Sequence, residues 1–246
     1  MRTDNNMLIE KCIKDIRYKR FLYHIYKAMG QVGRKIGSVI VHADDNNPLN
    51  IKVNERNYII YLSYILGTIE STTKNGFLGN TYYINGEIYK QIQSLANGKA
   101  KNAKESFDKF RNEKRNNEEN LKTEDYINVR PDFVIHASHD KVYDYKGQKL
   151  IIEAKTTRNL DDIDFCWDFL KLNVYVDEFK FANAIYMLVN TNKEHIEDML
   201  NLYKNEIGYF CNDMKKIWFF VQDWSGKEML PVEIYQMKTD IKTMLE

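Results

Sequence analysis

Two short segments of the chain combine apolar residues with side chains that can hold a metal ion or move a proton. Residues 130–135 read RPDFVI, and residues 150–155 read LIIEAK. Successive side chains of a strand point to opposite faces, so Glu153 and Lys155 share one face. A hairpin between the two segments would set Asp132 beside Glu153. Two carboxylates and an ammonium group would then converge at the end of an apolar strand pair.

Such a group of charges favours metal-assisted chemistry on phosphate esters. Burying two carboxylates close together is unfavourable, and it raises the pKa of one of them. A divalent cation removes this cost, and hard oxygen ligands suit Mg²⁺ or, in its place, Mn²⁺. The metal can lower the pKa of a bound water, while the lysine can orient that water or offset charge on the phosphoryl group.

The pattern Pro131-Asp132 followed by Glu153-Ala154-Lys155 resembles the motif of the PD-(D/E)xK nuclease superfamily. The resemblance implies an α/β fold with a restriction-endonuclease-like core, in which a small mixed central sheet is flanked by helices. It also implies that Asp132, Glu153 and Lys155 are catalytic. Asp132, Glu153 and the backbone carbonyl of Ala154 would then be the metal ligands.

The residues after the lysine are similar to the RecB-like branch of that superfamily, which includes phage recombination exonucleases. Thr156 and Thr157 follow Lys155, and a helix farther on carries Lys171 and Tyr175 where the branch has Gln-x-x-x-Tyr. The last two are i and i+4 neighbours and share a helix face. The resemblance therefore implies that Thr156, Lys171 and Tyr175 bind the substrate. Tyr175 as an aromatic residue at the edge of the core is the alternative.

Members of the family often add an acidic residue from an upstream helix. The segment from Gly79 to Tyr83 is similar to the Gly-x-x-Tyr-Glu pattern of phage exonucleases, with Tyr83 in place of the glutamate. Glu87, one helical turn later, is a candidate third metal ligand, and Glu70 is its competitor. An ordinary surface glutamate is the alternative for both.

The resemblance implies a metal-dependent deoxyribonuclease, an exonuclease that processes DNA ends in phage-type recombination, repair or defence. A restriction-type endonuclease and a nucleic-acid-binding module that does not cleave remain alternatives. DNA is the expected partner, and a single-strand-annealing or other recombination protein and a homo-oligomer are left open. Some relatives carry a four-cysteine iron–sulfur cluster. Three scattered cysteines, Cys12, Cys166 and Cys211, argue against such a cluster here and indicate reduced thiols.

Composition and charge exclude several other classes of protein. The 246 residues include 36 Lys and Arg, 35 Asp and Glu, 3 Pro and 11 Gly, which rules out collagen-like and mucin-like chains. No apolar run has the roughly 18–20 residues of a membrane span, and the first twelve residues contain no apolar signal region. We therefore expect a cytoplasmic protein with no membrane partner, and the resemblance implies a bacterial or phage-infected host cell.

The neutral total hides a polarity along the chain. Residues 1–37 contain 9 basic and 3 acidic side chains, whereas residues 158–246 contain 10 basic and 16 acidic ones. A basic segment can attract a polyanion even when the whole protein is neutral. Two oppositely charged solvated surfaces would give the same counts, so charge alone does not decide between the two interpretations.

Hydrophobic periodicity predicts one α/β domain. Strands are expected over 38–42, 127–135, 149–155, 183–190 and 216–222, and helices over 7–29, 55–71, 80–97, 161–180, 193–210 and 231–245. Thr191 and Glu194 match a capping box that would open the helix over 193–210.

We divide the chain into a basic, helical segment of unknown role over 1–78, packed on the core, and a nuclease core over 79–246. Within the core, residues 97–125 contain 15 charged residues among 29. This stretch is expected to be a solvated excursion, either an exposed charged helix or a mobile loop, and a flexible arm or lid over a nucleic-acid groove is the alternative.

Overall fold

The computed structural model describes most of the chain between residues 8 and 238. The described residues are 8–12, 15–36, 54–74, 76–79, 81–85, 90–92, 98–115, 127–129, 131–137, 147–157, 160–209, 211, 213–223 and 231–238. The strand expected over 38–42 and the candidate ligand Glu87 fall outside these ranges.

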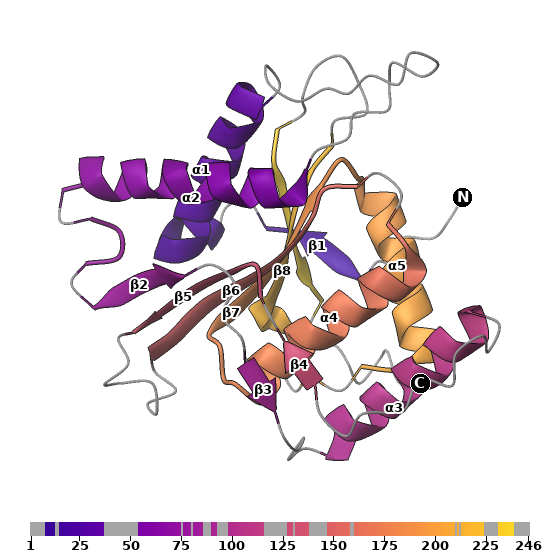
Figure 1. The fold of residues 1–246 in the computed structure, drawn as a ribbon. Helices are drawn as coiled ribbons and strands as arrows, with labels where there is room; N and C mark the ends of the chain where they lie inside the picture. Colours follow the sequence, from indigo (N-terminus) through magenta and orange to yellow (C-terminus); the bar gives the residue numbers. More distant parts are fainter. Residues whose placement is uncertain are drawn as a thin grey trace, which may run out of the picture.

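Seven strands form one mixed sheet at the centre of the molecule, in the order β1-β9-β8-β7-β6-β5-β2 (Figure 1). They are β1 (Ile9–Lys11), β2 (Tyr82–Asn85), β5 (Phe133–Ala137), β6 (Gln148–Lys155), β7 (Asn183–Val189), β8 (Ile217–Gln222) and β9 (Glu233–Met237). The three central strands β6, β7 and β8 run parallel, and every other neighbouring pair is antiparallel. A second, two-stranded sheet pairs β3 (Lys90–Ile92) with β4 (Ile127–Val129).

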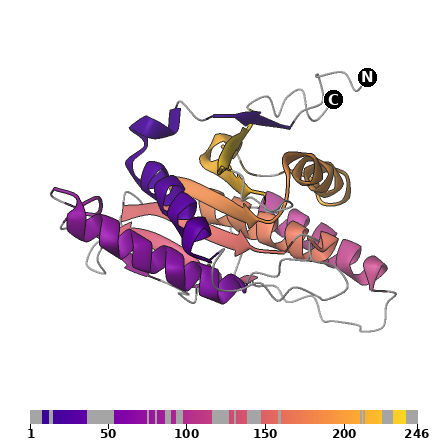
Figure 2. The same ribbon diagram turned by 90° about the horizontal axis from the view of Figure 1, so that it is seen from above.

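Helices cover both faces of the large sheet, as Figure 2 shows. One face carries α1 (Arg20–Ile36) and α2 (Glu55–Thr72), and the other carries α4 (Asp162–Asp177) and α5 (Lys193–Glu206), with α3 (Gly98–Lys114) packed outside α4. Two 3₁₀ helices, η2 (Asp15–Tyr18) and η5 (Met214–Lys216), complete the described elements. Among these residues, no helix combines the length and apolar character that crossing a bilayer requires.

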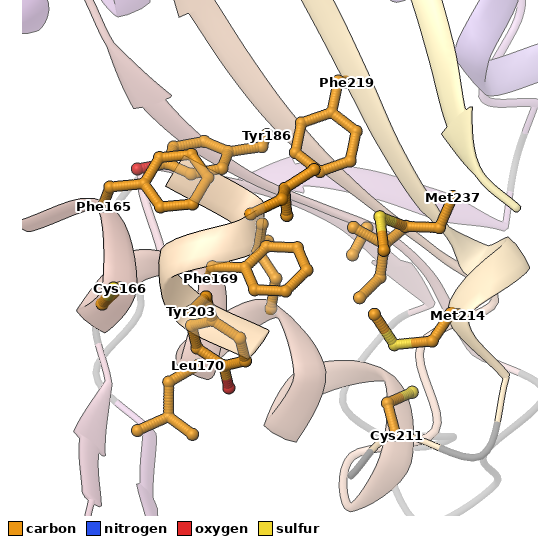
Figure 3. Close-up of a cluster of buried hydrophobic side chains, with 14 of the residues drawn as sticks. Phe165, Cys166, Phe169, Leu170, Tyr186, Tyr203, Cys211, Met214, Phe219 and Met237 are labelled. Atoms are coloured by element: carbon orange, nitrogen blue, oxygen red, sulfur yellow. The ribbon is translucent and has the colours of Figure 1, made fainter. Parts of the chain in front are cut away.

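The alternation of side chains along β6 divides the apolar residues into two cores. Ile151 belongs to the cluster beneath α4 and α5, whereas Ile152 belongs to the cluster beneath α1 and α2. The first cluster is rich in aromatic rings. Figure 3 shows Phe165 and Phe169 of α4 facing Tyr186 of β7 and Phe219 of β8. These contacts fix α4 against the two strands that follow it.

Most elements of the central α/β unit agree with the sequence-based prediction. The observed boundaries differ from the expected ones by at most four residues in strands β6, β7 and β8 and in helices α2, α4 and α5. The hairpin also forms, because β5 pairs with β6 in antiparallel register. The cap of α5 is Asn192 and not Thr191. Its side-chain oxygen accepts a hydrogen bond from the backbone N–H of His195 at 3.0 Å.

Three expected helices are wrong in whole or in part. Residues 80–97 contain strands β2 and β3, and the helix begins only at Gly98. The segment 7–29 opens with strand β1, and its long helix begins at Arg20. The described part of 231–245 is strand β9, in which Ile234 and Tyr235 are buried. In each case a short strand is stabilised by a partner that is distant in sequence, and local periodicity carries no information about that partner.

The charged stretch over 97–125 contains a helix, which is one of the two forms expected, but the helix is packed on the protein and is not a solvated excursion. Residues 98–114 form α3, whose apolar residues Ala100, Ala103, Phe107 and Phe110 are buried. The ring of Phe107 lies 5.1 Å from that of Trp167 on α4. Helix α3 is therefore a packed element with charges on its outer face. Residues 116–126 lie outside the description.

Residues from the first third of the chain complete the central sheet and its cover. Strand β1 forms the edge of the sheet next to β9. Buried residues of α1 and α2, among them Ile25, Met29, Leu62 and Leu66, share a core with Ile152 of β6. Residues 8–36 and 54–74 thus bury one face of the sheet that carries the candidate site.

Candidate functional site

The predicted site residues meet where the hairpin opens, at the carboxyl end of β6. Phe133 pairs with Ile152, and the backbone N–H of Asp132 donates to the carbonyl of Ile152 at 3.1 Å. Asp132 is therefore the residue opposite Glu153. Because β6, β7 and β8 are parallel, this end of the sheet is the edge at which open α/β sheets usually bind their ligands.

Asp132 is held by the strand beside it. Its Oδ2 accepts a hydrogen bond from the backbone N–H of Ala154 at 2.7 Å, which orients the carboxylate toward the end of β6. Desolvation raises the pKa of Asp132, and the Ala154 N–H and the charge of Lys171 oppose that rise.

Glu153 is almost completely buried, with 3% of its surface exposed, and helix α4 supplies partners for both of its oxygens. Lys171 Nζ lies 2.8 Å from Oε2, and the Tyr175 hydroxyl donates to Oε1 at 3.1 Å. Burial is the main cause of the raised pKa of Glu153, and the ammonium group of Lys171 counteracts it. The two α4 residues share a helix face, as their spacing predicts, and that face points at Glu153 and not at solvent.

Lys155 lies on the same side of β6 as Glu153 and contacts carboxylates from two helices. Its Nζ is 3.3 Å from Asp168 Oδ2 on α4 and 3.8 Å from Glu55 Oε2 on α2. Desolvation, the largest single influence, lowers the pKa of Lys155, but the two carboxylates together outweigh it and the net shift is upward. Lys155 therefore carries its positive charge at neutral pH.

Asp168 joins the two lysines of the site. Its Oδ1 is 2.8 Å from Lys171 Nζ, and its Oδ2 accepts a hydrogen bond from the Tyr186 hydroxyl at 3.3 Å as well as contacting Lys155. Sequence reasoning missed Asp168, although its place one helical turn before Lys171 was visible. An Asp–Lys pair at that spacing is common on exposed helices, so the pattern does not distinguish a site residue.

Glu55, the first residue of α2, is the second residue that sequence reasoning missed. Asn54 caps the helix by accepting from the backbone N–H of Asn57 at 3.0 Å, and this start places the Glu55 side chain near Lys155. The pKa of Glu55 is raised to about 7, chiefly because the carboxyl is desolvated; the charge of Lys155 opposes the rise, and that of Asp132 adds to it. An acidic residue in a first helical turn usually serves the helix dipole, so its type gave no signal.

Glu70 is not at the site, which corrects the expectation that it competes for the third metal position. Its Oε2 accepts the backbone N–H groups of Phe77 and Leu78 at 2.5 and 2.8 Å. It lies 15 residues after Glu55 on α2, which is about 22 Å along the helix axis at 1.5 Å per residue. A side chain at Gly76 would collide with the Glu70 carboxylate, since a Cβ there would lie 2.0 Å from Oε1. Glu70 thus shapes the turn that follows α2.

The remaining predicted residues occupy interior positions. Thr156, directly after β6, is buried at 4% exposure. Cys12 lies in the core beneath α1 and α2, whereas Cys166 and Cys211 lie in the core beneath α4 and α5, and none of these three described cysteines forms a disulfide.

The donor set fits one hard divalent cation that is only partly enclosed by protein. Within the described residues, no three Asp, Glu, His or Cys side chains are arranged to hold a cation by themselves. Asp132 and Glu153 adjoin the Ala154 backbone, and two carboxylates, a carbonyl and solvent or phosphate oxygens are the usual surroundings of Mg²⁺. The site contains four carboxylates and two ammonium groups, so its net charge is −2 when all are ionised. The carboxylates are Asp132, Glu153, Asp168 and Glu55, and the ammonium groups are Lys155 and Lys171.

No protein-family model, no curated protein and no solved structure matches this chain. Its function must therefore be argued from the side chains gathered at the end of β6 and from the elements that hold them there.

Proposed function

We propose that the chain is a metal-dependent deoxyribonuclease of the PD-(D/E)xK type, built on a restriction-endonuclease-like core. The observation that carries the proposal is the pairing of Asp132 with Glu153 across a hairpin, with Lys155 two residues later on the same strand. The order of elements supports it, because the hairpin is followed by α4 and by β7, which runs parallel to β6.

In this proposal Asp132, Glu153 and the Ala154 carbonyl hold Mg²⁺, which Mn²⁺ can replace. The bound cation supplies a water of lowered pKa and neutralises charge on the phosphate. Lys155 is the charged group on the same side of β6 as Glu153. We assign it the role of orienting the attacking water and offsetting the charge that develops on the phosphoryl oxygens.

Lys171 and Tyr175 have a different role from the substrate contacts implied by the sequence. Both are buried and both bind Glu153, so they orient this carboxylate and do not reach for a DNA backbone. Asp168 in turn positions Lys155 and Lys171. Glu55, at the start of α2, takes the place that Glu87 or Glu70 was expected to fill, as the acidic residue supplied by an upstream helix.

Cleavage of linear duplex DNA by the purified protein tests the proposal. We expect nucleotides or single strands to be released with Mg²⁺ or Mn²⁺ and nothing to be released with a chelator. Asp132→Asn and Glu153→Gln should each abolish release, because both lose a ligand charge. Asp198→Asn, on the exposed side of α5, is the matched control and should keep full activity. Full activity in either site variant would refute the assignment.

Covalently closed circular DNA separates the two modes of cleavage. An exonuclease that processes ends leaves such DNA intact, whereas a restriction-type endonuclease cuts it when it contains a recognition site. Tight DNA binding with no cleavage of any substrate under either metal would identify a binding module.

A further inference from the structure

Lys171 occupies a position from which it can control how strongly the site binds a metal ion. We infer that its ammonium group is a built-in counter-ion of Glu153, which balances the charge of this carboxylate when no metal is bound and lowers the affinity of the site for divalent cations. The inference rests on the proposed function in one respect: Glu153 must be a metal ligand.

The geometry fixes the ammonium group against the carboxylate. Lys171 Nζ lies 2.8 Å from Glu153 Oε2 and 2.8 Å from Asp168 Oδ1, and the residue is 8% exposed. A buried amine held by two carboxylates has few alternative positions, because leaving either one would strand a charge in the interior. Tyr175 holds the other oxygen of Glu153, so the carboxylate cannot turn away from the amine.

A cation bound between Asp132 and Glu153 would share a carboxylate with this amine. Two positive charges on one carboxylate repel each other, and the repulsion is weakly screened at a buried site. The charge balance leads to the same conclusion. With Lys171 the site residues total −2, which one divalent cation neutralises, and an uncharged residue at this position would leave −3. Lys171 therefore weakens the binding of a first cation and disfavours a second.

Calorimetric titration of the metal-free protein with Mn²⁺ tests this inference without reference to activity. Lys171→Gln, which removes the charge and keeps a hydrogen-bond donor, should bind Mn²⁺ about tenfold more tightly than the wild type or better. Lys171→Arg, which keeps the charge, should stay within about threefold of the wild type. An affinity of Lys171→Gln that equals or falls below that of the wild type would overturn the inference.

Lys104 provides a matched control. It forms a similarly enclosed pair with Asp108 on α3, at 2.5 Å and with the lysine side chain 11% exposed, compared with 10% for Lys171. Lys104→Gln should leave the Mn²⁺ affinity unchanged, because this pair lies outside the site. A gain as large as that of Lys171→Gln would show that the effect is not local, and would count against the inference.

A second variant covers the case in which Lys171→Gln does not fold. In Asp168→Asn the amine depends on Glu153 alone, and the site also loses one negative charge. Mn²⁺ affinity should therefore fall at least about threefold, the opposite sign to Lys171→Gln. Unchanged or tighter binding by Asp168→Asn would contradict the inference.

The outcomes separate this inference from the nuclease proposal. If Lys171→Gln binds Mn²⁺ more tightly than the wild type and neither protein cleaves DNA, the counter-ion role stands and the nuclease proposal fails. If the wild type cleaves DNA while Lys171→Gln shows no gain in affinity, only the counter-ion role fails. Absence of Mn²⁺ binding in both proteins would refute both.

Discussion

At the scale of single residues, the site contains three carboxylates whose pKa values are displaced in the same direction. Burial raises the pKa of Asp132, Glu153 and Glu55, and the two lysines only partly oppose this. The metal-free protein therefore keeps negative charge at the end of β6 at the expense of stability. Carboxyl pKa values shifted in this way are typical of functional sites, although structural ion pairs also shift them.

The raised pKa of Glu55 has a measurable effect on how the stability of the protein depends on pH. Its pKa is about 7 in the folded chain against an ordinary value of 4.5, so between these pH values the folded state keeps a proton that the unfolded state has lost. The resulting stabilisation is complete below about pH 4.5 and is lost as the pH rises through about 7. Metal-free wild type should therefore lose stability from this group between pH 5 and pH 8, roughly the range in which it ionises. In Glu55→Gln the decline should be smaller.

Thermal unfolding of both proteins in a chelating buffer across this range measures the difference. Asp164→Asn, an exposed change on another helix, serves as the control and should follow the wild type. Identical pH profiles for wild type and Glu55→Gln would show that the Glu55 carboxyl is not held as described.

Asp168 is expected to act through the residues it holds. Asp168→Asn should lower kcat by about ten- to a hundredfold and leave KM for DNA nearly unchanged, because Asp168 contacts Lys155 and Lys171 and is buried. Steady-state kinetics with linear DNA checks this split, with Asp198→Asn, an exposed change on α5, as the control. A large rise in KM at constant kcat would assign Asp168 to substrate binding.

The period of a strand was sufficient to predict that Glu153 and Lys155 share a face and that Asp132 lies beside Glu153. The same reasoning could not identify Asp168 or Glu55, because their proximity to Lys155 depends on how α4 and α2 pack against the sheet. It also placed Lys171 and Tyr175 on the correct helix face, but it did not show that this face is directed into the interior.

At the scale of elements, α3 is the clearest difference between pattern and structure. Its high charge suggested a solvated excursion, yet Phe107 is buried and packs against Trp167 of α4. Phe107→Ala should therefore lower the free energy of unfolding by about 3–5 kcal/mol. Urea unfolding measures this, and Glu105→Ala on the exposed side of α3 should change it by less than about 0.5 kcal/mol. A comparably small effect of Phe107→Ala would mean that α3 is not packed on α4.

Long or continuously apolar elements were predictable, and short ones were not. Strands β6, β7 and β8 are buried on both faces and therefore appear in the sequence as continuous apolar runs. Such a run can be recognised without knowing which residues face which side of the sheet. Strands β1, β2 and β9 are three to five residues long; β1 and β2 depend on partners far away in sequence, and β9 pairs with β1 as well as with the preceding strand β8. Helical spacing within such short segments is accidental, and this accounts for the three expected helices that are wrong.

At the scale of the whole molecule, residues near the N-terminus cover the sheet on which the site is built. Apolar residues of α1 and α2 share a core with β5, β6, β7 and β8, and β1 pairs with β9. A chain shortened to residues 79–246 should therefore fail to fold cooperatively, because one sheet face would be exposed. Near-ultraviolet circular dichroism and urea unfolding test this. A sharp, cooperative transition in the shortened chain would show that residues 1–78 are dispensable.

The central claim is that Lys155 is the charged catalytic group beside a metal site formed by the β5–β6 hairpin. The most direct test compares the initial rate of Mg²⁺-dependent cleavage of end-labelled linear duplex DNA by wild type, Lys155→Met and Lys149→Met. Lys149 is the matched control, since it lies on β6 six residues before Lys155, about 20 Å away along the strand. We predict that Lys155→Met loses cleavage by at least about a hundredfold while Lys149→Met keeps the wild-type rate. Equal rates for all three proteins, or no cleavage by the wild type with Mg²⁺ or Mn²⁺, would contradict the account.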